Sequence, residues 1–189
     1  MSEFSRDGGI YSLDLSLDEA HILINLVEQL LELLGEGDFN HHYDESDPFA
    51  QLMSQLKAAP EEVTTPEDPV LLRLLPSAYA DPEAAADFRR YTEPTLRGKK
   101  KRTLAQVREA LAIIVDEDRA GTVADLDSEV WLMAINDLRL ALSVRLEIDP
   151  DSFDLFESLA EEDPQKAIYA VYFWLGWLQE NLLNLLTGG

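Results

Sequence analysis

Residues 167–178 read AIYAVYFWLGWL, twelve consecutive residues without a charged side chain. The rest of the chain is strongly charged, and its formal net charge is −22. The run is shorter than the roughly 20 apolar residues of a bilayer-spanning helix. It is followed at once by polar residues, beginning with Gln179. We therefore expect a central C-terminal helix that is surrounded by protein.

The composition fits one helical domain and excludes thiol chemistry. The chain has 189 residues, 46% of them hydrophobic, which is enough for a buried core. It has no cysteine, so disulfides, thiolate nucleophiles, cysteine-ligated zinc and thiol redox switches are excluded. The first residues, MSEFSRD, lack the basic start and apolar core of a signal peptide. We expect a cytoplasmic protein without a cofactor.

Aspartate–proline pairs mark the expected helix starts. The aspartate accepts hydrogen bonds from the first free N–H groups, and proline suits the first helical position. Such pairs occur at residues 47–48, 68–69, 81–82 and 163–164, and Ser16 with Glu19 forms a capping box. The expected helices cover 16–35, 48–59, 69–75, 83–91, 92–115, 127–147, a short turn at 153–159, and a terminal helix from 164.

Two short segments have the pattern of strands. Residues 10–15 alternate between apolar and polar side chains, and residues 121–126 contain the β-prone pair Thr122 and Val123. We expect these segments to pair with each other. The predicted fold class is therefore mainly α, a single domain over residues 1–189. It is a bundle of about six or seven helices with a minor two-stranded β element.

The strongest candidate for a binding site is a basic island at residues 89–108. This segment carries a net charge of +7, whereas both flanking parts of the chain are strongly acidic. On a helix its charges surround the axis and do not form one stripe. The island would bind a phosphate group or an acidic protein surface. The alternative is a solvated helix whose positive charges offset an acidic neighbourhood. The candidate residues are Arg89, Arg90, Arg97, Lys99, Lys100, Lys101, Arg102 and Arg108.

Other polar groups favour a structural interpretation. Asn136, Arg139 and Ser143 lie at i, i+3 and i+7 on an expected helix, where they form either a polar pocket or dimer contact, or a network that fixes helix packing. The loop around His41 and His42 has several carboxylates but no helical metal-binding spacing, which favours a solvated loop. We expect no bound metal. The chain has no glycine-rich phosphate loop and no carboxylate pair marked out for catalysis, so we do not expect an enzyme.

Four segments in order resemble a known family. They are EDPVLLRLLPSAY at 67–79, DFRRYTE at 87–93 with Leu96 and Arg97, WLMAINDLRLAL at 131–142, and YFWL at 172–175 with LQE at 178–180. Together they resemble the actinobacterial family called domain of unknown function 2017. The resemblance covers almost the whole chain. It implies a cytoplasmic, mostly helical, non-enzymatic protein.

The resemblance also implies a regulatory role. The family is linked to an actinomycete oxidative-stress regulator that acts with the transcription machinery on genes of cysteine biosynthesis. This chain departs from that picture because it has no cysteine for a disulfide switch near its N-terminus. It also has Ser143 and Val144 where the family tends to have glycine and a small polar residue.

Two functional hypotheses follow from these observations. The first is a transcription-associated regulator that contacts a sigma factor or RNA polymerase, with the basic island touching DNA or an acidic partner surface. The second is a structural or scaffolding module that self-associates, as a homodimer for example, through apolar helix faces without nucleic acid.

Overall fold

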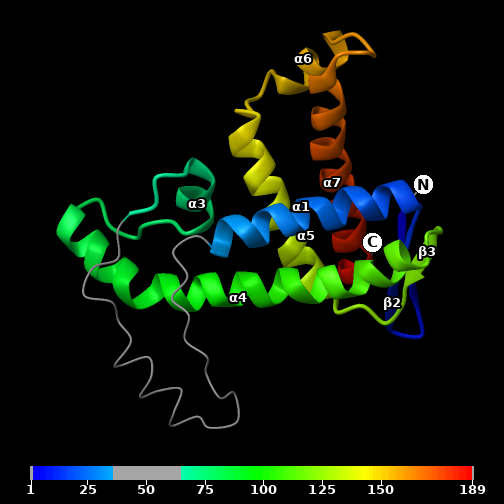
Figure 1. Ribbon diagram of the computed structural model, residues 1–189, viewed down its shortest axis with the longest axis horizontal. Helices are drawn as coiled ribbons and strands as arrows, with labels where there is room; N and C mark the ends of the chain where they lie inside the picture. The colour runs from blue at the N-terminus through cyan, green and yellow to red at the C-terminus, as the bar shows by residue number, and fades with distance from the viewer. Residues whose placement is uncertain (1, 36–64, 189) are drawn as a thin grey trace, which may run out of the picture.

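The computed structural model describes residues 2–35 and 65–188, and over these residues the protein is predominantly helical (Figure 1). This confirms the predicted mainly α fold class. The predicted helix at 48–59 and the histidine loop lie outside the described residues. The elements are β1 (Glu3–Asp7), β2 (Ile10–Leu15), α1 (Leu17–Gly35), α3 (Pro69–Leu74), α4 (Pro82–Asp116), β3 (Gly121–Val123), α5 (Ser128–Arg145), α6 (Ser152–Ser158) and α7 (Pro164–Thr187).

The strands form a small antiparallel sheet with the order β1-β2-β3. The predicted pairing of β2 with β3 is confirmed, and Leu13 lies opposite Val123. The prediction of two strands was incomplete, because β1 also pairs with β2. The sequence EFSRD of β1 lacks the alternation of apolar and polar residues typical of a strand, and only Phe4 is buried. Gly8 and Gly9 have positive φ and make the turn between β1 and β2.

The predicted starts of α1, α3, α4, α5 and α7 agree with the structure. Asp68, Asp81 and Asp163 each accept a hydrogen bond from a backbone N–H in the first turn of α3, α4 and α7, and Asp127 does the same for α5. Ser16 and Glu19 form the capping box of α1, because the Ser16 N–H donates to Glu19 Oε2 at 2.8 Å. These starts are readable from the sequence because each depends on three or four neighbouring residues.

The predicted break at Thr92 is wrong. One continuous helix of 35 residues, α4, replaces the two expected helices, and Pro94 lies inside it. Pro94 has no N–H to donate to the Arg90 carbonyl, and its ring crowds the preceding turn, yet the helix continues through it. The Thr92 hydroxyl does not cap a new helix but donates to the carbonyl of Phe88, four residues earlier on α4, at 2.8 Å. Helix α1 packs along the part of α4 that follows the proline, and its last turn lies beside Arg97 (Figure 1).

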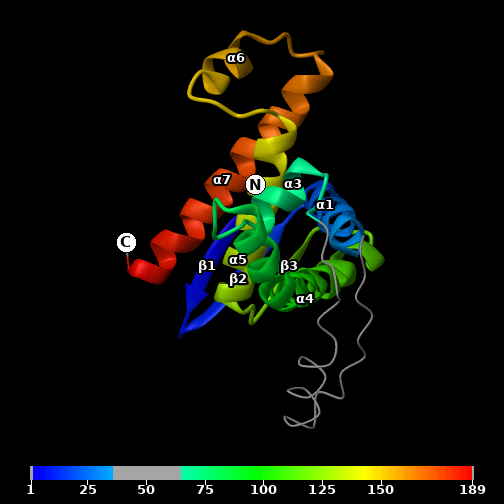
Figure 2. The same ribbon diagram turned by 90° about the vertical axis from the view of Figure 1, so that its left-hand side faces the viewer.

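The core connects all parts of the described chain except α6. It includes Leu13 of β2, Leu23 of α1, Leu104 of α4 and Ile135 of α5, and α7 contributes Leu175, Leu178 and Leu182. The expectation that residues 167–178 are surrounded by protein holds only for part of the run. Figures 1 and 2 show the first turns of α7 leaving the body of the molecule beside α5, with α6 at their far end. There Ile168 is 46% exposed, and Phe173 packs on Phe153 of α6 with ring centroids 5.4 Å apart.

Candidate functional site

The eight basic residues of the island all lie on α4, but the structure divides them into two groups. Arg89 and Arg97 are buried and Lys100 is half-buried, and all three have partners inside the protein. Lys99, Arg102 and Arg108 are exposed, whereas Arg90 and Lys101 are half-buried. The island is therefore not one continuous surface.

The inner group is centred on Glu93. Its two carboxylate oxygens accept hydrogen bonds from Arg89 Nη1 and Arg97 Nη2, each at 2.7 Å. The same two guanidinium groups donate to the carbonyl oxygens of Leu75, just after α3, and Leu34, in the last turn of α1. Carbonyl groups in the last turn of a helix generally lack an intrahelical donor, and the arginines supply donors to these two. The triad thus joins α1, α3 and α4.

Lys100 points to a different helix. Its Nζ atom lies 2.7 Å from Oδ1 of Asp137 on α5. The Asp137 carboxyl is buried, and this burial raises its pKa above the ordinary value, although the hydrogen bond and the charge of Lys100 act in the opposite direction. The pair joins α4 to α5, so Lys100 has a structural partner.

We call four of the five remaining basic residues, all except Arg90, the outer α4 surface: Lys99, Lys101, Arg102 and Arg108. Lys99 and Arg102, at i and i+3, lie on one flank of the helix, and Lys101 and Arg108, at i and i+7, lie on the opposite flank. Nearby on the same helix, Tyr91 is 67% exposed, and the Arg90 guanidinium stacks over its ring at 5.5 Å. This combination of cations and an aromatic ring suits an acidic protein surface or a phosphate backbone.

The polar residues of α5 form a network with α7. Arg139 Nη1 donates to Oε1 of Gln179 at 2.6 Å, and Gln179 Nε2 donates to Oδ1 of Asn136 at 3.5 Å. The Arg139 guanidinium also lies over the ring of Tyr172 at 5.2 Å. Ser143 stays outside this network, because its hydroxyl donates to the carbonyl of Leu140 on its own helix. The network supports the packing interpretation of these side chains.

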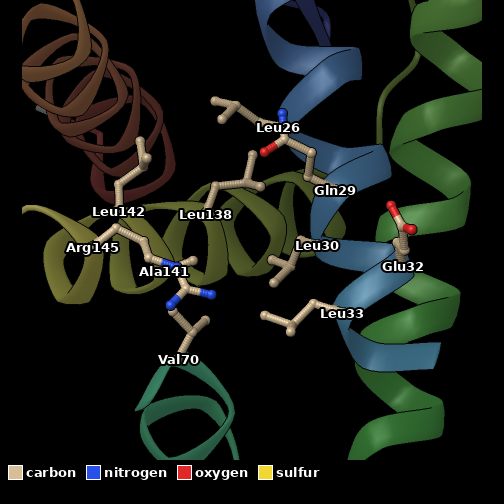
Figure 3. Close-up of a pocket in the computed structure, with 10 residues that line it drawn as sticks. All are labelled: Leu26, Gln29, Leu30, Glu32, Leu33, Val70, Leu138, Ala141, Leu142 and Arg145. Carbon is tan, nitrogen blue, oxygen red and sulfur yellow. The ribbon is translucent and has the colours of Figure 1, made fainter. Parts of the chain in front are cut away.

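A groove lies between α1, α3 and α5, away from the basic residues of α4 (Figure 3). Its volume is about 300 Å³, and mainly aliphatic side chains line it. Within residues 2–35 and 65–188, no group of three or more metal-binding side chains occurs. None of the helices in these same ranges combines the length and the apolar character of a bilayer-spanning segment.

Comparison with known proteins identifies the family. The family model described as domain of unknown function (DUF2017) matches residues 1–186. The chain belongs to this family. Among the DUF2017 relatives, an oxidative stress regulator AosR from Mycobacterium tuberculosis is 32% identical over 97% of this chain and 85% of its own length. A putative oxidative stress regulator AosR from Mycobacterium leprae is 32% identical over 89% of this chain and 78% of its own length. No solved structure matches this member of DUF2017.

Part of this site could be read from the sequence of this DUF2017 protein and part could not. Glu93 and Arg97 are spaced at i and i+4, which predicts an ion pair on one helix face, whereas the expected break at Thr92 places Arg89 on a separate helix. The spacing does not reveal that the face is buried. The residues that bond to Arg97, Arg89 and Lys100 are distant from them in the sequence, so no local pattern predicts the bonds. They are Leu34, Leu75 and Asp137, respectively.

Proposed function

We propose that this protein is a cytoplasmic regulator of the oxidative-stress response that acts through protein contacts. In this proposal it contacts a sigma factor or RNA polymerase, and through them affects transcription of oxidative-stress and cysteine-biosynthesis genes. The observation that carries the regulatory role is the 32% identity, over 97% of the chain, to a relative named an oxidative stress regulator. The absence of cysteine means that the chain itself does not sense oxidants through thiols.

The outer α4 surface is the proposed contact site. It is a cluster of positive charge on a protein of net charge −22, so an acidic partner surface or DNA meets favourable electrostatics there and repulsion over most of the remaining surface. Arg89, Arg97 and Lys100 support the site indirectly, because their internal bonds fix α4 against α1, α3 and α5. DNA contact is proposed as a secondary role of the same residues.

A pull-down from native lysate tests this proposal. The test variant replaces Lys99, Arg102 and Arg108 by Gln, and leaves Lys100 in place because Asp137 needs its partner. The control variant replaces Arg6, Arg73 and Arg119 by Gln, which removes the same charge from three other exposed positions. We expect polymerase or sigma subunits to be retained by the wild type and the control, and lost from the test variant, with or without nuclease. Equal retention by both variants contradicts the proposed contact.

The second candidate function is a self-associating module. The observation that favours it is the exposed apolar surface of α6 and α7, where Phe153 is 51%, Ile168 46% and Trp177 37% exposed. Light scattering after size exclusion distinguishes the two functions. A homodimer that persists at high salt and is lost in Ile168→Ser and Trp177→Ser supports this candidate, and a monomer at all concentrations contradicts it.

A further inference from the structure

Helix α6 lies at the far end of α5 and α7, away from α1, α4 and the sheet (Figures 1 and 2). None of its residues, Ser152–Ser158, belongs to the hydrophobic core of the described chain. One side of α6 is held by Phe156, whose ring lies 5.2 Å from that of Phe173 on α7. The opposite side of this short helix faces solvent and has no element of the described chain packed on it.

The solvent side of α6 combines apolar and acidic side chains. Phe153 is 51% and Leu155 46% exposed. Asp154 and Glu157, at i and i+3, are also exposed, and around the helix they lie between these two apolar residues. Within residues 2–35 and 65–188 neither carboxylate takes part in an ion pair. We call these four residues the α6 face.

The surroundings of the α6 face are acidic too. Every charged side chain of residues 147–163 is an aspartate or a glutamate. The cations at the two ends of this stretch are already paired, because Arg145 lies 2.6 Å from Asp68 and Lys166 lies 2.6 Å from Glu161. A partner that covers the α6 face therefore meets uncompensated negative charge.

We propose that the α6 face docks on a basic protein surface in which lysine or arginine side chains surround an apolar patch. The apolar patch buries Phe153 and Leu155. Because Asp154 and Glu157 lie between them, the same contact removes two carboxylates from water, which is costly unless the partner supplies cations. A helix whose one side is free suits docking into a groove of the partner.

The α6 face is separate from the outer α4 surface. The two lie on different helices, and the charges have opposite signs, so each selects a different class of partner. The inference about the α6 face therefore does not depend on the contact proposed for α4. If both hold, the protein bridges an acidic and a basic partner.

Charge opposes the other occupants of the α6 face. A symmetric dimer through this helix would place identical carboxylates against each other, on two chains that each carry a net charge of −22. Nucleic acid and anionic lipid surfaces carry the same sign of charge and are repelled. A purely apolar protein surface would bury Asp154 and Glu157 without a counter-charge.

The probe for this proposal is a synthetic lysine–leucine peptide of about 14 residues, the length at which isolated helices begin to form. Leucines at i, i+4, i+7 and i+11 form its apolar face, and lysines occupy the other positions. A matched peptide carries glutamate at every lysine position. Methyl NMR spectra of the full chain at low ionic strength report the contact. We expect the lysine peptide to shift the signals of Leu155 and to leave those of Leu183, an exposed leucine in the last turns of α7, unchanged.

The first pair of variants tests the apolar part of the α6 face. Leu155→Ser removes an exposed leucine from α6, and Leu183→Ser removes one that is 40% exposed on α7. We expect Leu155→Ser to weaken binding of the lysine peptide about tenfold, because it removes an apolar contact at the centre of the interface. Leu183→Ser should change binding less than about twofold.

The second pair of variants tests the charges. Asp154→Asn with Glu157→Gln neutralises the two carboxylates of the α6 face, and Glu28→Gln with Glu32→Gln neutralises two exposed carboxylates of α1. We expect about fivefold weaker binding in the α6 variant, as two exposed ion pairs supply, and less than about twofold in the α1 variant. The difference should shrink in high salt, which screens exposed charges.

Three outcomes would overturn the proposal. Equal weakening by the α6 and α1 charge variants would mean nonspecific attraction to an acidic protein. Equal binding of the lysine and glutamate peptides would exclude a cationic partner surface. A homodimer in light scattering that is lost in Leu155→Ser and kept in Leu183→Ser would make a second copy the occupant. Because Asp154 and Glu157 are exposed, their neutralisation remains a valid test if Leu155→Ser disturbs the fold of α6.

Discussion

The guanidinium of Arg97 donates a hydrogen bond from Nη1 to the carbonyl oxygen of Leu34 at 2.9 Å, and so joins the middle of α4 to the last turn of α1. A positive charge at this position also interacts favourably with the negative end of the α1 dipole. Glu93 holds the guanidinium in place from one turn earlier on α4. This relationship explains why an arginine within the basic island is unavailable to an external partner.

Removing Glu93 is expected to destabilise the fold strongly. Glu93→Ala leaves the guanidinium groups of Arg89 and Arg97 buried without their carboxylate, so we expect a loss of about 3–5 kcal/mol in the free energy of unfolding. Urea denaturation followed by circular dichroism measures it. Glu109→Ala, an exposed position on the same helix, is the control and should stay within about 0.5 kcal/mol. A loss below about 1 kcal/mol in Glu93→Ala contradicts a central role for the triad.

The sequence predicts those features of the fold that depend on neighbouring residues, and it does not predict those that depend on residues distant in the sequence. Asp81 and Asp163 predict the starts of α4 and α7, because a helix cap depends only on neighbouring residues. The sequence does not predict the continuity of α4 through Pro94, because the bonds of Arg89 to Leu75 and of Arg97 to Leu34, one on each side of the proline, offset a local breaking signal. The sequence does not predict β1 for the same reason. Its strand conformation depends on pairing with β2 and on the hydrogen bond from the Phe4 N–H to Asn181 on α7.

The candidate site follows the same rule. A count of charges locates the basic island, but it cannot separate Lys99, which is exposed, from Lys100, which faces Asp137. That division depends on the angular position of each residue around α4 and on the helices packed against it. The groove was not anticipated, because its lining comes from three helices whose relative positions no local pattern encodes.

Asp137 is expected to make stability fall as the pH rises from the acid range. Its pKa is raised in the folded protein, so the folded state holds a proton that the unfolded chain releases above the ordinary value near 3.8. Asp137→Asn cannot ionise and lacks this effect. We therefore expect the stability of the wild type relative to Asp137→Asn to decrease between about pH 3 and neutrality, with Asp87→Asn as the exposed control. Denaturation at a series of pH values measures this, and a difference that grows with pH contradicts it.

Glu19 is expected to show the opposite dependence on pH. Burial acts to raise its pKa, but hydrogen bonds from Ser16 and Ser2 outweigh this and lower it. The charged carboxylate therefore contributes stability above the unfolded value near 4.5, and this contribution is lost as the pH falls through the folded value. We expect Glu19→Gln to be about 1 kcal/mol less stable than the wild type at pH 7, because hydrogen bonds to a charged group are stronger.

The same variant has a defined behaviour in acid. Its difference from the wild type should shrink as the pH falls below about 4.5 and through the lowered pKa of the folded state, beneath which Glu19 is protonated in both states. Glu28→Gln, an exposed position on α1, is the control and should match the wild type throughout. A deficit that is independent of pH would mean that the shape of the side chain matters there and its charge does not.

Replacing Pro94 is expected to stabilise the protein. Pro94→Ala restores an N–H that can donate to the Arg90 carbonyl and removes the clash of the ring with the preceding turn. We expect the free energy of unfolding to rise by about 1–3 kcal/mol, measured by urea denaturation. Ala105→Pro, in the same helix but without a native proline, should unfold it. If Pro94→Ala instead destabilises the protein, the proline ring contributes packing or a bend that α4 needs to place Glu93 between Arg89 and Arg97.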